Sequence, residues 1–172
     1  MEFNFELGLK EISYKTVVCS HRIAVRAIIM LDGLLLMVQN NKGDVKLPGG
    51  GVMQGETHYG AIRREVKEET GYTVSKINEL IGAVKERKED IYKEDTVFEM
   101  TSYYYLCMID EEREELEKFE LDDYEKDLGF VPVWLSIKQA IKINESVLKE
   151  NNDINTWIIR EIEVLKRLDG LF

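Results

Sequence analysis

Three carboxylates at helical spacing are the residues of this chain best suited to chemistry. Glu65, Glu68 and Glu69 stand at positions i, i+3 and i+4 of a predicted helix, so they share one face. The helix does not need that face for its core, because Ile62 and Val66 supply an apolar stripe. Carboxylates clustered without histidine or cysteine suit hard, oxygen-preferring cations, Mg²⁺ or Mn²⁺ rather than Zn²⁺.

A glycine-rich loop precedes this helix. Gly49, Gly50 and Gly51 follow a leucine and a proline, and the helix predicted over residues 57–70 begins a few residues later. Glycine permits backbone conformations that other residues avoid, so such a loop lets carbonyls and amides approach a ligand closely. A Mg²⁺ site typically combines one or two carboxylates with waters and substrate phosphates, so loop and helix together indicate a metal-dependent enzyme acting on phosphates. The alternative is a surface helix whose glutamates pair with neighbouring basic residues, namely Arg63, Arg64 and Lys67.

Residues 50–72 resemble the Nudix box, G-x5-E-x7-R-E-U-x-E-E-x-G-U, in which U is an aliphatic residue. Every fixed charged or glycine position of the box matches. The one departure is Tyr72 at the last aliphatic position, where its ring retains the apolar bulk. The matching positions are Gly50, Glu56, Arg64, Glu65, Val66, Glu68, Glu69 and Gly71. On these residues the chain is identified as a member of the Nudix hydrolase family, which is MutT-like.

The resemblance implies an α+β fold, a mixed β-sheet packed between helices as an α/β/α sandwich, with the box as loop, helix and loop. It implies that the box binds a divalent cation, Mg²⁺ or Mn²⁺. The implied metal ligands are Glu65, Glu68, Glu69 and the carbonyl of Gly50. It further implies that Arg64 and Glu56 form a supporting ion pair that orients the loop and the helix, with Gly49 and Gly51 supporting the loop.

The implied reaction is hydrolysis of a pyrophosphate bond in a nucleoside diphosphate linked to another moiety. An anionic nucleophile must then reach an anionic phosphorus, which requires charge neutralisation by the cation, positioning and a carboxylate base. Within the box, Glu65 or Glu68 fits the base. Candidates outside the box are Glu99, Glu125 and Asp127, and the sequence does not choose among them. The last two belong to a run, residues 108–127, with eleven acidic and three basic residues, which is typical of a solvated segment.

Substrate contacts outside the box are less sharply indicated. The basic residues Arg22, Arg26 and Lys46 lie near the box in sequence and are candidates for phosphate contacts. Phe98 and Tyr104 are candidates for contact with a base, although packing in the core is the commoner use of such rings. The expected substrate is a nucleoside triphosphate, including an oxidised one, with an ADP-sugar such as ADP-ribose as the neighbouring option.

The elements that must position these residues follow from hydrophobic patterning and turn residues. Asp32 and Gly33 separate two short apolar runs and predict a hairpin. Strands are predicted over residues 23–30, 34–38, 80–84, 98–108 and 129–135. Helices are predicted over residues 57–70, 136–143 and 153–168, the first with Thr57 as its N-cap and Gly71 as its stop. This order predicts a layered α+β domain.

Composition sets the outer bounds of function. The chain has 172 residues, which suits a single domain spanning residues 1–172, and a formal net charge of −10. The acidic balance argues against a nucleic-acid duplex as partner. No apolar run approaches a membrane span, and Glu2 and Glu6 stand where a secretory signal carries positive charge, so we expect a cytoplasmic protein without a membrane partner. Cys19 and Cys107 form no C-x-x-C pair and are expected to be reduced thiols.

Three further alternatives remain at this point. One is a non-catalytic domain that senses a nucleotide through the same fold, although such domains often lose box carboxylates and this chain keeps all of them. Another is a prenyl diphosphate isomerase, which would need a suitably placed catalytic cysteine. The apolar stripe of the last predicted helix suits either the core or the face of a homodimer; its residues are Ile154, Trp157, Ile158, Ile162 and Leu165.

Overall fold

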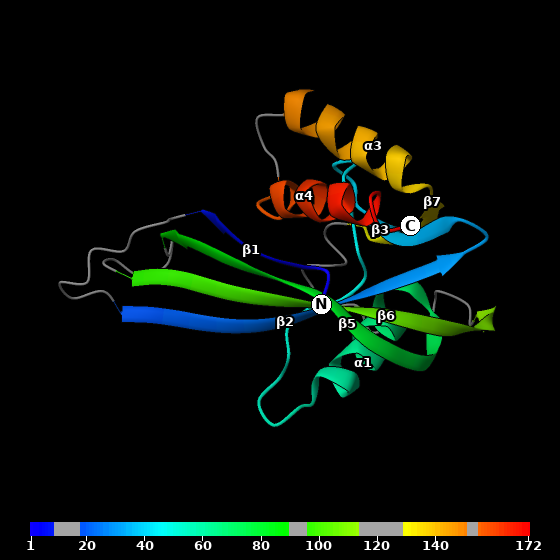
Figure 1. Cartoon of the computed structure of the whole chain (residues 1–172), viewed down its shortest axis with the longest axis horizontal. Helices are drawn as coiled ribbons and strands as arrows, with labels where there is room; N and C mark the ends of the chain where they lie inside the picture. Colours follow the sequence, from blue (N-terminus) through cyan, green and yellow to red (C-terminus); the bar gives the residue numbers. More distant parts are fainter. Residues whose placement is uncertain (9–17, 90–95, 114–128, 151–154) are drawn as a thin grey trace.

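A computed structural model describes residues 1–8, 18–89, 96–113, 129–150 and 155–172. The sheet comprises β1 (Phe3–Gly8), β2 (Val18–Leu31), β3 (Leu34–Gln39), β4 (Val45–Lys46), β5 (Tyr72–Glu89), β6 (Thr96–Arg113) and β7 (Val131–Leu135). The helices are α1 (His58–Thr70), α3 (Ile137–Glu150) and α4 (Ile158–Leu168). Helix α1 lies on one side of the sheet, and α3 and α4 lie on the other (Figure 1).

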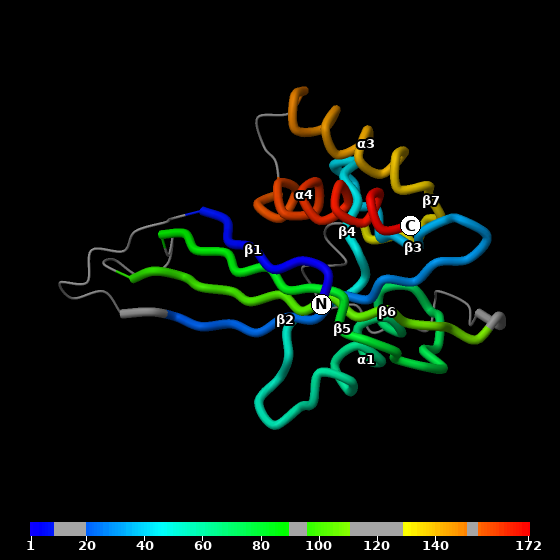
Figure 2. Tube along the Cα trace, in the orientation of Figure 1, coloured from blue at the N-terminus to red at the C-terminus, as the bar shows by residue number. Residues whose placement is uncertain are grey.

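The sheet mixes parallel and antiparallel pairs. Its strand order is β1-β5-β6-β2-β3-β4, and β7 pairs with β3. Strand β1 runs parallel to β5 and β2 runs parallel to β6, whereas β5 with β6 and β3 with each of its neighbours are antiparallel. Strands β1, β5, β6 and β2 run side by side and extend beyond the helices at one end (Figure 2). The mixed sheet between helices confirms the expected fold class.

Strand β2 separates two hydrophobic cores because successive side chains of a strand point to opposite faces. Val25, Ala27 and Ile29 pack with Ile62 of α1, whereas Ile28 packs on the side of α3 and α4. All of these side chains are almost fully buried. The box helix is therefore fixed to the sheet by its apolar stripe, as the sequence predicts, and its acidic residues are left for other contacts.

The hairpin between β2 and β3 forms where the sequence predicts it. Asp32 has φ of 51° and Gly33 has φ of 76°, so both central residues of the turn are left-handed. This is the backbone of a type I′ turn, whose twist matches that of the flanking strands. The turn lets β3 pair directly with the end of β2, through Met30 with Leu35 and Leu31 with Leu34.

Several boundaries differ from those predicted. The strands predicted over 80–84 and 98–108 are parts of β5 and β6, which have 18 residues each. Strand β1 was not predicted, although Phe3, Phe5 and Leu7 alternate with other residues as strand residues do. Strand β4 was also missed; with two residues it is too short for periodicity to reveal. Helix α3 continues past residue 143 to Glu150, beyond its most apolar stretch.

The last helix, α4, begins at Ile158, later than the predicted start at residue 153. Residues 153 and 154 lie outside the described residues. Its stripe is used inside the chain. Ile158, Ile162 and Leu165 are buried, and Leu165 packs into the core above the sheet. The stripe thus does not supply a dimer face, and a homodimer stays a prediction that needs another surface.

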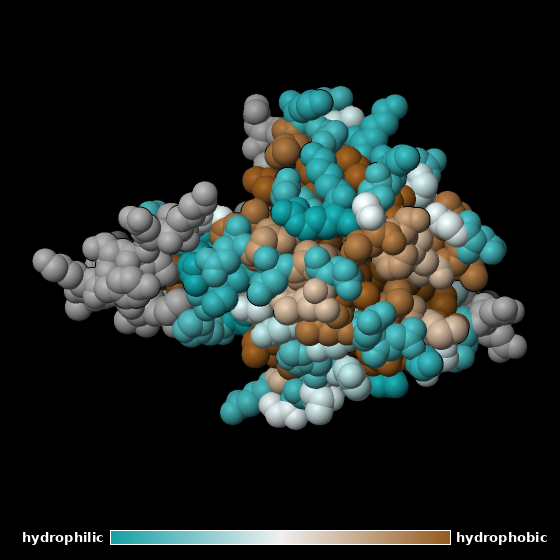
Figure 3. Space-filling view, viewed as in Figure 1, coloured by the Kyte–Doolittle hydropathy of each residue, from teal (hydrophilic) through white to brown (hydrophobic). Residues whose placement is uncertain are grey.

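Helices α3 and α4 turn polar faces outward. Hydrophilic side chains cover much of the surface in the part of the view where these two helices lie (Figure 3). Lys166 of α4 and Glu145 of α3 form an ion pair across that surface, 2.8 Å between Nζ and Oε1. In the part of the chain that the structure describes, no helix is long and apolar enough to cross a membrane.

Candidate active site

Helix α1 has well-defined ends. The hydroxyl of Thr57 accepts a hydrogen bond of 3.1 Å from the amide of Gly60, which satisfies one of the free amides of the first turn. At the other end, Gly71 has φ of 78° and its amide donates to the carbonyl of Lys67. Both caps agree with the sequence prediction, and they fix the helix over the segment that carries the acidic residues.

The glycine-rich loop is joined to β2 by backbone hydrogen bonds. Val25 donates to the carbonyl of Gly50 over 2.9 Å, and the amide of Val52 donates to Ile23 over 2.9 Å. These bonds place the loop between the sheet and α1. A Cβ on Gly50 would lie 2.3 Å from a carboxylate oxygen of Glu65, so the glycine leaves room for this carboxylate in its present position against the loop.

Arg64 is the hub of the acidic cluster. Its Nε and Nη2 donate to the two oxygens of Glu56 over 3.0 and 2.9 Å, as a bidentate pair. Its Nη1 donates to Glu65 over 2.7 Å and to Glu68 over 3.2 Å, and Nη2 also donates to the carbonyl of Gly51 over 3.0 Å. The expected ion pair between Arg64 and Glu56 is therefore present. One guanidinium ties the loop and three carboxylates together.

The electrostatics of the cluster separate Glu56 from the helix carboxylates. The bidentate bond from Arg64 lowers the pKa of Glu56 below its ordinary value. Burial raises the pKa of Glu65, and the nearby charge of Glu69 raises it further. Burial also raises the pKa of Glu68, although Arg64 opposes the effect. Glu65 and Glu68 thus gain basicity from the fold, whereas Glu56 is held as a carboxylate that anchors Arg64.

Glu69 lies deeper than its two neighbours. It is only 1% exposed, one of its oxygens pairs with the ammonium of Lys46, and the other accepts the amide of Gly49 over 2.8 Å. The same ammonium donates to the carbonyl of Gly49 over 3.1 Å. The three carboxylates therefore do not share one open face, because Glu69 is turned into this buried contact.

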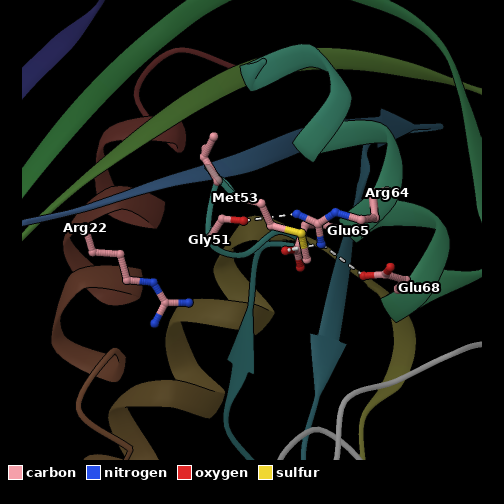
Figure 4. A pocket seen from close by; sticks show the side chains of 7 residues that line it. Arg22, Gly51, Met53, Arg64, Glu65 and Glu68 are labelled. Atoms are coloured by element: carbon pink, nitrogen blue, oxygen red, sulfur yellow. Dashed lines mark hydrogen bonds and ion pairs between the residues drawn. The ribbon is translucent and has the colours of Figure 1, made fainter. Parts of the chain in front are cut away.

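A pocket of about 310 Å³ opens beside the cluster. Glu65 and Glu68 of α1 line it together with Arg64, and the loop and β2 form its other wall (Figure 4). The residues on that other wall are Gly51, Val52, Met53 and Arg22. The pocket brings together the first two predicted catalytic carboxylates, the box arginine and a loop glycine.

The carbonyl of Gly50 accepts a hydrogen bond from Val25 of β2, which occupies one of its two lone pairs, so its part as a metal ligand stays a prediction. The carbonyls of Gly49 and Gly51 meet charged side chains. One predicted site residue needs correction. Tyr104 is fully buried and packs edge-on against Phe3, with ring centroids 5.4 Å apart, so it forms core instead of contacting a base.

The remaining candidates that the structure describes do not line the pocket. Arg26 is buried and donates to the carbonyl of Val25, and its Nε has no hydrogen-bond partner. Phe98 lies under the ammonium of Lys88 on the extended part of the sheet. Glu99 pairs with Arg87 over 2.7 Å and with His21 over 3.1 Å on the same extension. Glu125 and Asp127 lie outside the described residues.

The chemistry of the donors fits a hard divalent cation. The acidic groups on the pocket wall, Glu65 and Glu68, offer only oxygen, and burial raises the pKa of both despite the opposing charge of Arg64. In the described ranges, however, no three acidic, histidine or cysteine side chains converge closely enough to hold an ion by themselves. Water and substrate phosphates would have to complete the coordination, as is usual for Mg²⁺.

Arg22 and Met53 also line the pocket, and of the two only Arg22 was predicted to contact a ligand, as one of three candidates for a phosphate contact. Arg22 was one of several basic residues near the box, and nothing in its spacing distinguished it. Met53 occupies a variable position of the box and is 61% exposed. Both reach the pocket because the loop pairs with β2, including a bridge between Ala24 and Gly51, and that pairing is a tertiary feature that local pattern does not reveal.

Residues 20–155 match the family model of the NUDIX domain. A segment of 72 residues is 42% identical to ADP-ribose pyrophosphatase of Methanocaldococcus jannaschii. The matched segment covers 40% of this chain and 42% of the relative, so the match spans less than half of that curated protein.

Solved structures agree in fold. A UDP-X diphosphatase superimposes with a TM-score of 0.54 at 18% identity, over 93% of this chain and 68% of that chain. The MutT NUDIX hydrolase from Burkholderia pseudomallei gives 0.52 at 19% identity, over 84% and 97%. At such identities the likeness concerns the fold alone. The family model matches most of this chain, and the box residues lie around one pocket, so the chain belongs to the Nudix hydrolase family.

Proposed function

We propose that this protein hydrolyses the pyrophosphate bond of a nucleoside diphosphate joined to a sugar, with ADP-ribose as the first substrate to test. The observation that supports this most is the complete Nudix box folded around a pocket lined by Glu65 and Glu68. The segment shared with the ADP-ribose pyrophosphatase favours ADP-ribose over the nucleoside triphosphate that the short sequence first suggested. Water would add to one phosphorus, and the bond from that phosphorus to the bridging oxygen would break, which leaves two phosphate monoesters.

The side chains of the pocket have distinct parts in this proposal. Glu65 and Glu68 would hold a divalent cation, Mg²⁺ or Mn²⁺, which when bound supplies charge neutralisation for the diphosphate. Burial raises the pKa of both carboxylates in the absence of a cation, and the one that does not coordinate the cation directly would accept a proton from the attacking water. Arg64 fixes the rotamers of both through its hydrogen bonds, and Glu56 in turn fixes Arg64.

The paired Lys46 and Glu69 support the loop in this proposal. Lys46 was predicted to touch a phosphate, but its ammonium binds Glu69 and the carbonyl of Gly49. This contact keeps the glycine loop against the C-terminal turn of α1. Glu69 remains an expected metal ligand by family resemblance, and it would need to release Lys46 to reach a bound cation.

The two alternatives predict different behaviour. A nucleotide sensor would bind ADP-ribose without turnover, although it has no need of carboxylates with raised pKa. An isomerase would need a reactive thiol, yet burial raises the pKa of the Cys107 thiol to about 12, which keeps it protonated. Hydrolysis is therefore the function that the described residues support best.

The test is a hydrolysis panel with products resolved by mass spectrometry. ADP-ribose, a UDP-sugar, nucleoside triphosphates and a dinucleoside polyphosphate would each be incubated with and without Mg²⁺. We expect AMP and ribose 5-phosphate from ADP-ribose, and only with a divalent cation. In ¹⁸O-labelled water the product that gains the label identifies the phosphorus attacked. Binding of ADP-ribose without any product would instead favour the sensor.

A further inference from the structure

We propose that Arg22 binds the phosphate of the diphosphate group that lies away from Glu65 and Glu68, and so determines which ligands the pocket accepts. The proposal deepens the proposed function and rests on it. The pocket has two cationic side chains among the described residues, Arg22 and Arg64. A diphosphate carries negative charge on both phosphorus groups, so each group needs a partner of its own.

Arg64 is not available for this task. Its guanidinium already donates to three carboxylates and to one carbonyl, at 2.7 to 3.2 Å. These bonds use all three nitrogens of the fork. A phosphate would have to break one of them and leave a buried or partly buried acceptor without its partner, which is costly.

Arg22 is in the opposite situation. It is an exposed residue on β2, and in the described ranges its side chain has no hydrogen bond or ion pair with another residue. It lies across the pocket from Glu68, with Gly51 and Met53 between (Figure 4). An arginine fork suits phosphate oxygens better than a lysine does, because it offers two parallel N–H donors.

The absence of a side chain at Gly51 leaves room for the guanidinium of Arg22. A Cβ built on Gly51 would lie 2.8 Å from Nη2 and 3.1 Å from Nε of Arg22, and all of its nearest neighbours are atoms of that one side chain. Gly51 does not have a positive φ, so alanine is compatible with its backbone. A methyl group here would therefore displace Arg22 while leaving the loop intact.

The geometry gives the two sides of the pocket separate parts. The carboxylate side, with its cation, takes the phosphate that is attacked, and the Arg22 side takes its neighbour. Met53, exposed at the pocket wall, offers an apolar surface next to Arg22 for the moiety that this second phosphate bears. A ligand with a single phosphate group would use only one side, so it should bind more weakly than a diphosphate.

Binding and turnover test this with four single variants and one double variant. Methylenediphosphonate, in which CH₂ replaces the bridging oxygen, reports binding by calorimetry without hydrolysis. We expect Arg22→Ala to weaken its binding about tenfold to hundredfold and to raise KM for ADP-ribose by a similar factor, with a much smaller change in kcat. Arg22→Lys should recover part of the loss. The matched control is Arg63→Ala, which removes an exposed arginine whose side chain donates to a helix carbonyl.

Gly51→Ala provides an independent arm. It should raise KM in the presence of Arg22 and have no further effect in Arg22→Ala protein, because its clash is with Arg22 alone. Equal KM values and equal methylenediphosphonate binding for Arg22→Ala and Arg63→Ala would overturn the proposal, even where the wild type hydrolyses ADP-ribose normally. Loss of methylenediphosphonate binding in Arg22→Ala but not in Arg63→Ala supports the proposal, even if no compound in the panel is turned over. The lack of turnover would then reject only the hydrolase function.

Discussion

Replacing Arg64 by lysine keeps the positive charge and removes the planar guanidinium. The arginine makes five hydrogen bonds, of which four go to carboxylates of Glu56, Glu65 and Glu68 and one to a carbonyl. An ammonium has three donors and no planar fork, so at least two of these bonds are lost. The change keeps the net charge, and any effect therefore comes from geometry.

The magnitude follows from those lost bonds. A hydrogen bond to a charged group is worth roughly 1.5–3 kcal/mol when its loss leaves the partner unsatisfied. The side chain of Arg64 is 23% exposed, so water replaces part of the loss, and we expect about 2–3 kcal/mol of lost stability. For a protein of this size that corresponds to a fall in Tm of about 4–12 °C.

The assay is thermal unfolding followed by circular dichroism, with kcat measured on the same samples. Arg63→Lys is the matched control, since Arg63 is exposed and makes one bond of 3.4 Å. We expect Arg64→Lys to melt well below this control and to lose most of its kcat, because Glu65 and Glu68 lose their fixed rotamers. A melting temperature within about 1 °C of the control, with kcat intact, would refute the role of Arg64 as the hub.

Three further predictions concern single groups. Burial raises the pKa of Glu65, so the charge of this group destabilises the folded state once the pH exceeds the ordinary carboxyl pKa. Glu65→Gln should therefore raise Tm at neutral pH in the absence of metal and abolish turnover. A lower Tm would contradict this. Arg87 lowers the pKa of Glu99, so this pair stabilises the fold above the ordinary carboxyl pKa and loses that effect as the pH falls through the lowered value. Glu99→Gln should therefore lower the free energy of unfolding by about 1 kcal/mol at pH 7, measured by urea unfolding. The difference from wild type should vanish in acid. The hydroxyl of Tyr104 is buried without a hydrogen-bond partner, so Tyr104→Phe should hold or raise stability, and a loss above about 1 kcal/mol would indicate a partner that this account lacks.

Features set by local chemistry were predictable from the sequence. Thr57 and Gly71 delimit the box helix because capping depends on residues within one turn. Asp32 and Gly33 form the turn because only a few residue types accept positive φ at both positions. The pairing of Arg64 with Glu56 followed from the box pattern, and their side chains do meet.

Features set by contacts between distant segments were not predictable in the same way. Helical spacing alone predicted Glu69 on the same open face as Glu65. The burial of Glu69 depends on its ion pair with Lys46, which belongs to β4. Tyr104 belongs to a strand whose faces only the packing of β1 and α4 distinguishes, so its role as core could not be read from its alternation. Arg22 joins the pocket through the pairing of the loop with β2.

The central claim is that Glu68 and its neighbours form a metal-dependent hydrolytic site. The most direct measurement is the rate of AMP release from ADP-ribose by wild type and Glu68→Gln, with and without Mg²⁺. Glu145→Gln, which removes an exposed carboxylate from the ion pair with Lys166, is the matched control. We expect turnover that requires the cation, falls at least about a hundredfold in Glu68→Gln and is unchanged in the control. Equal turnover in all three proteins, or turnover that does not respond to the cation, would contradict the claim.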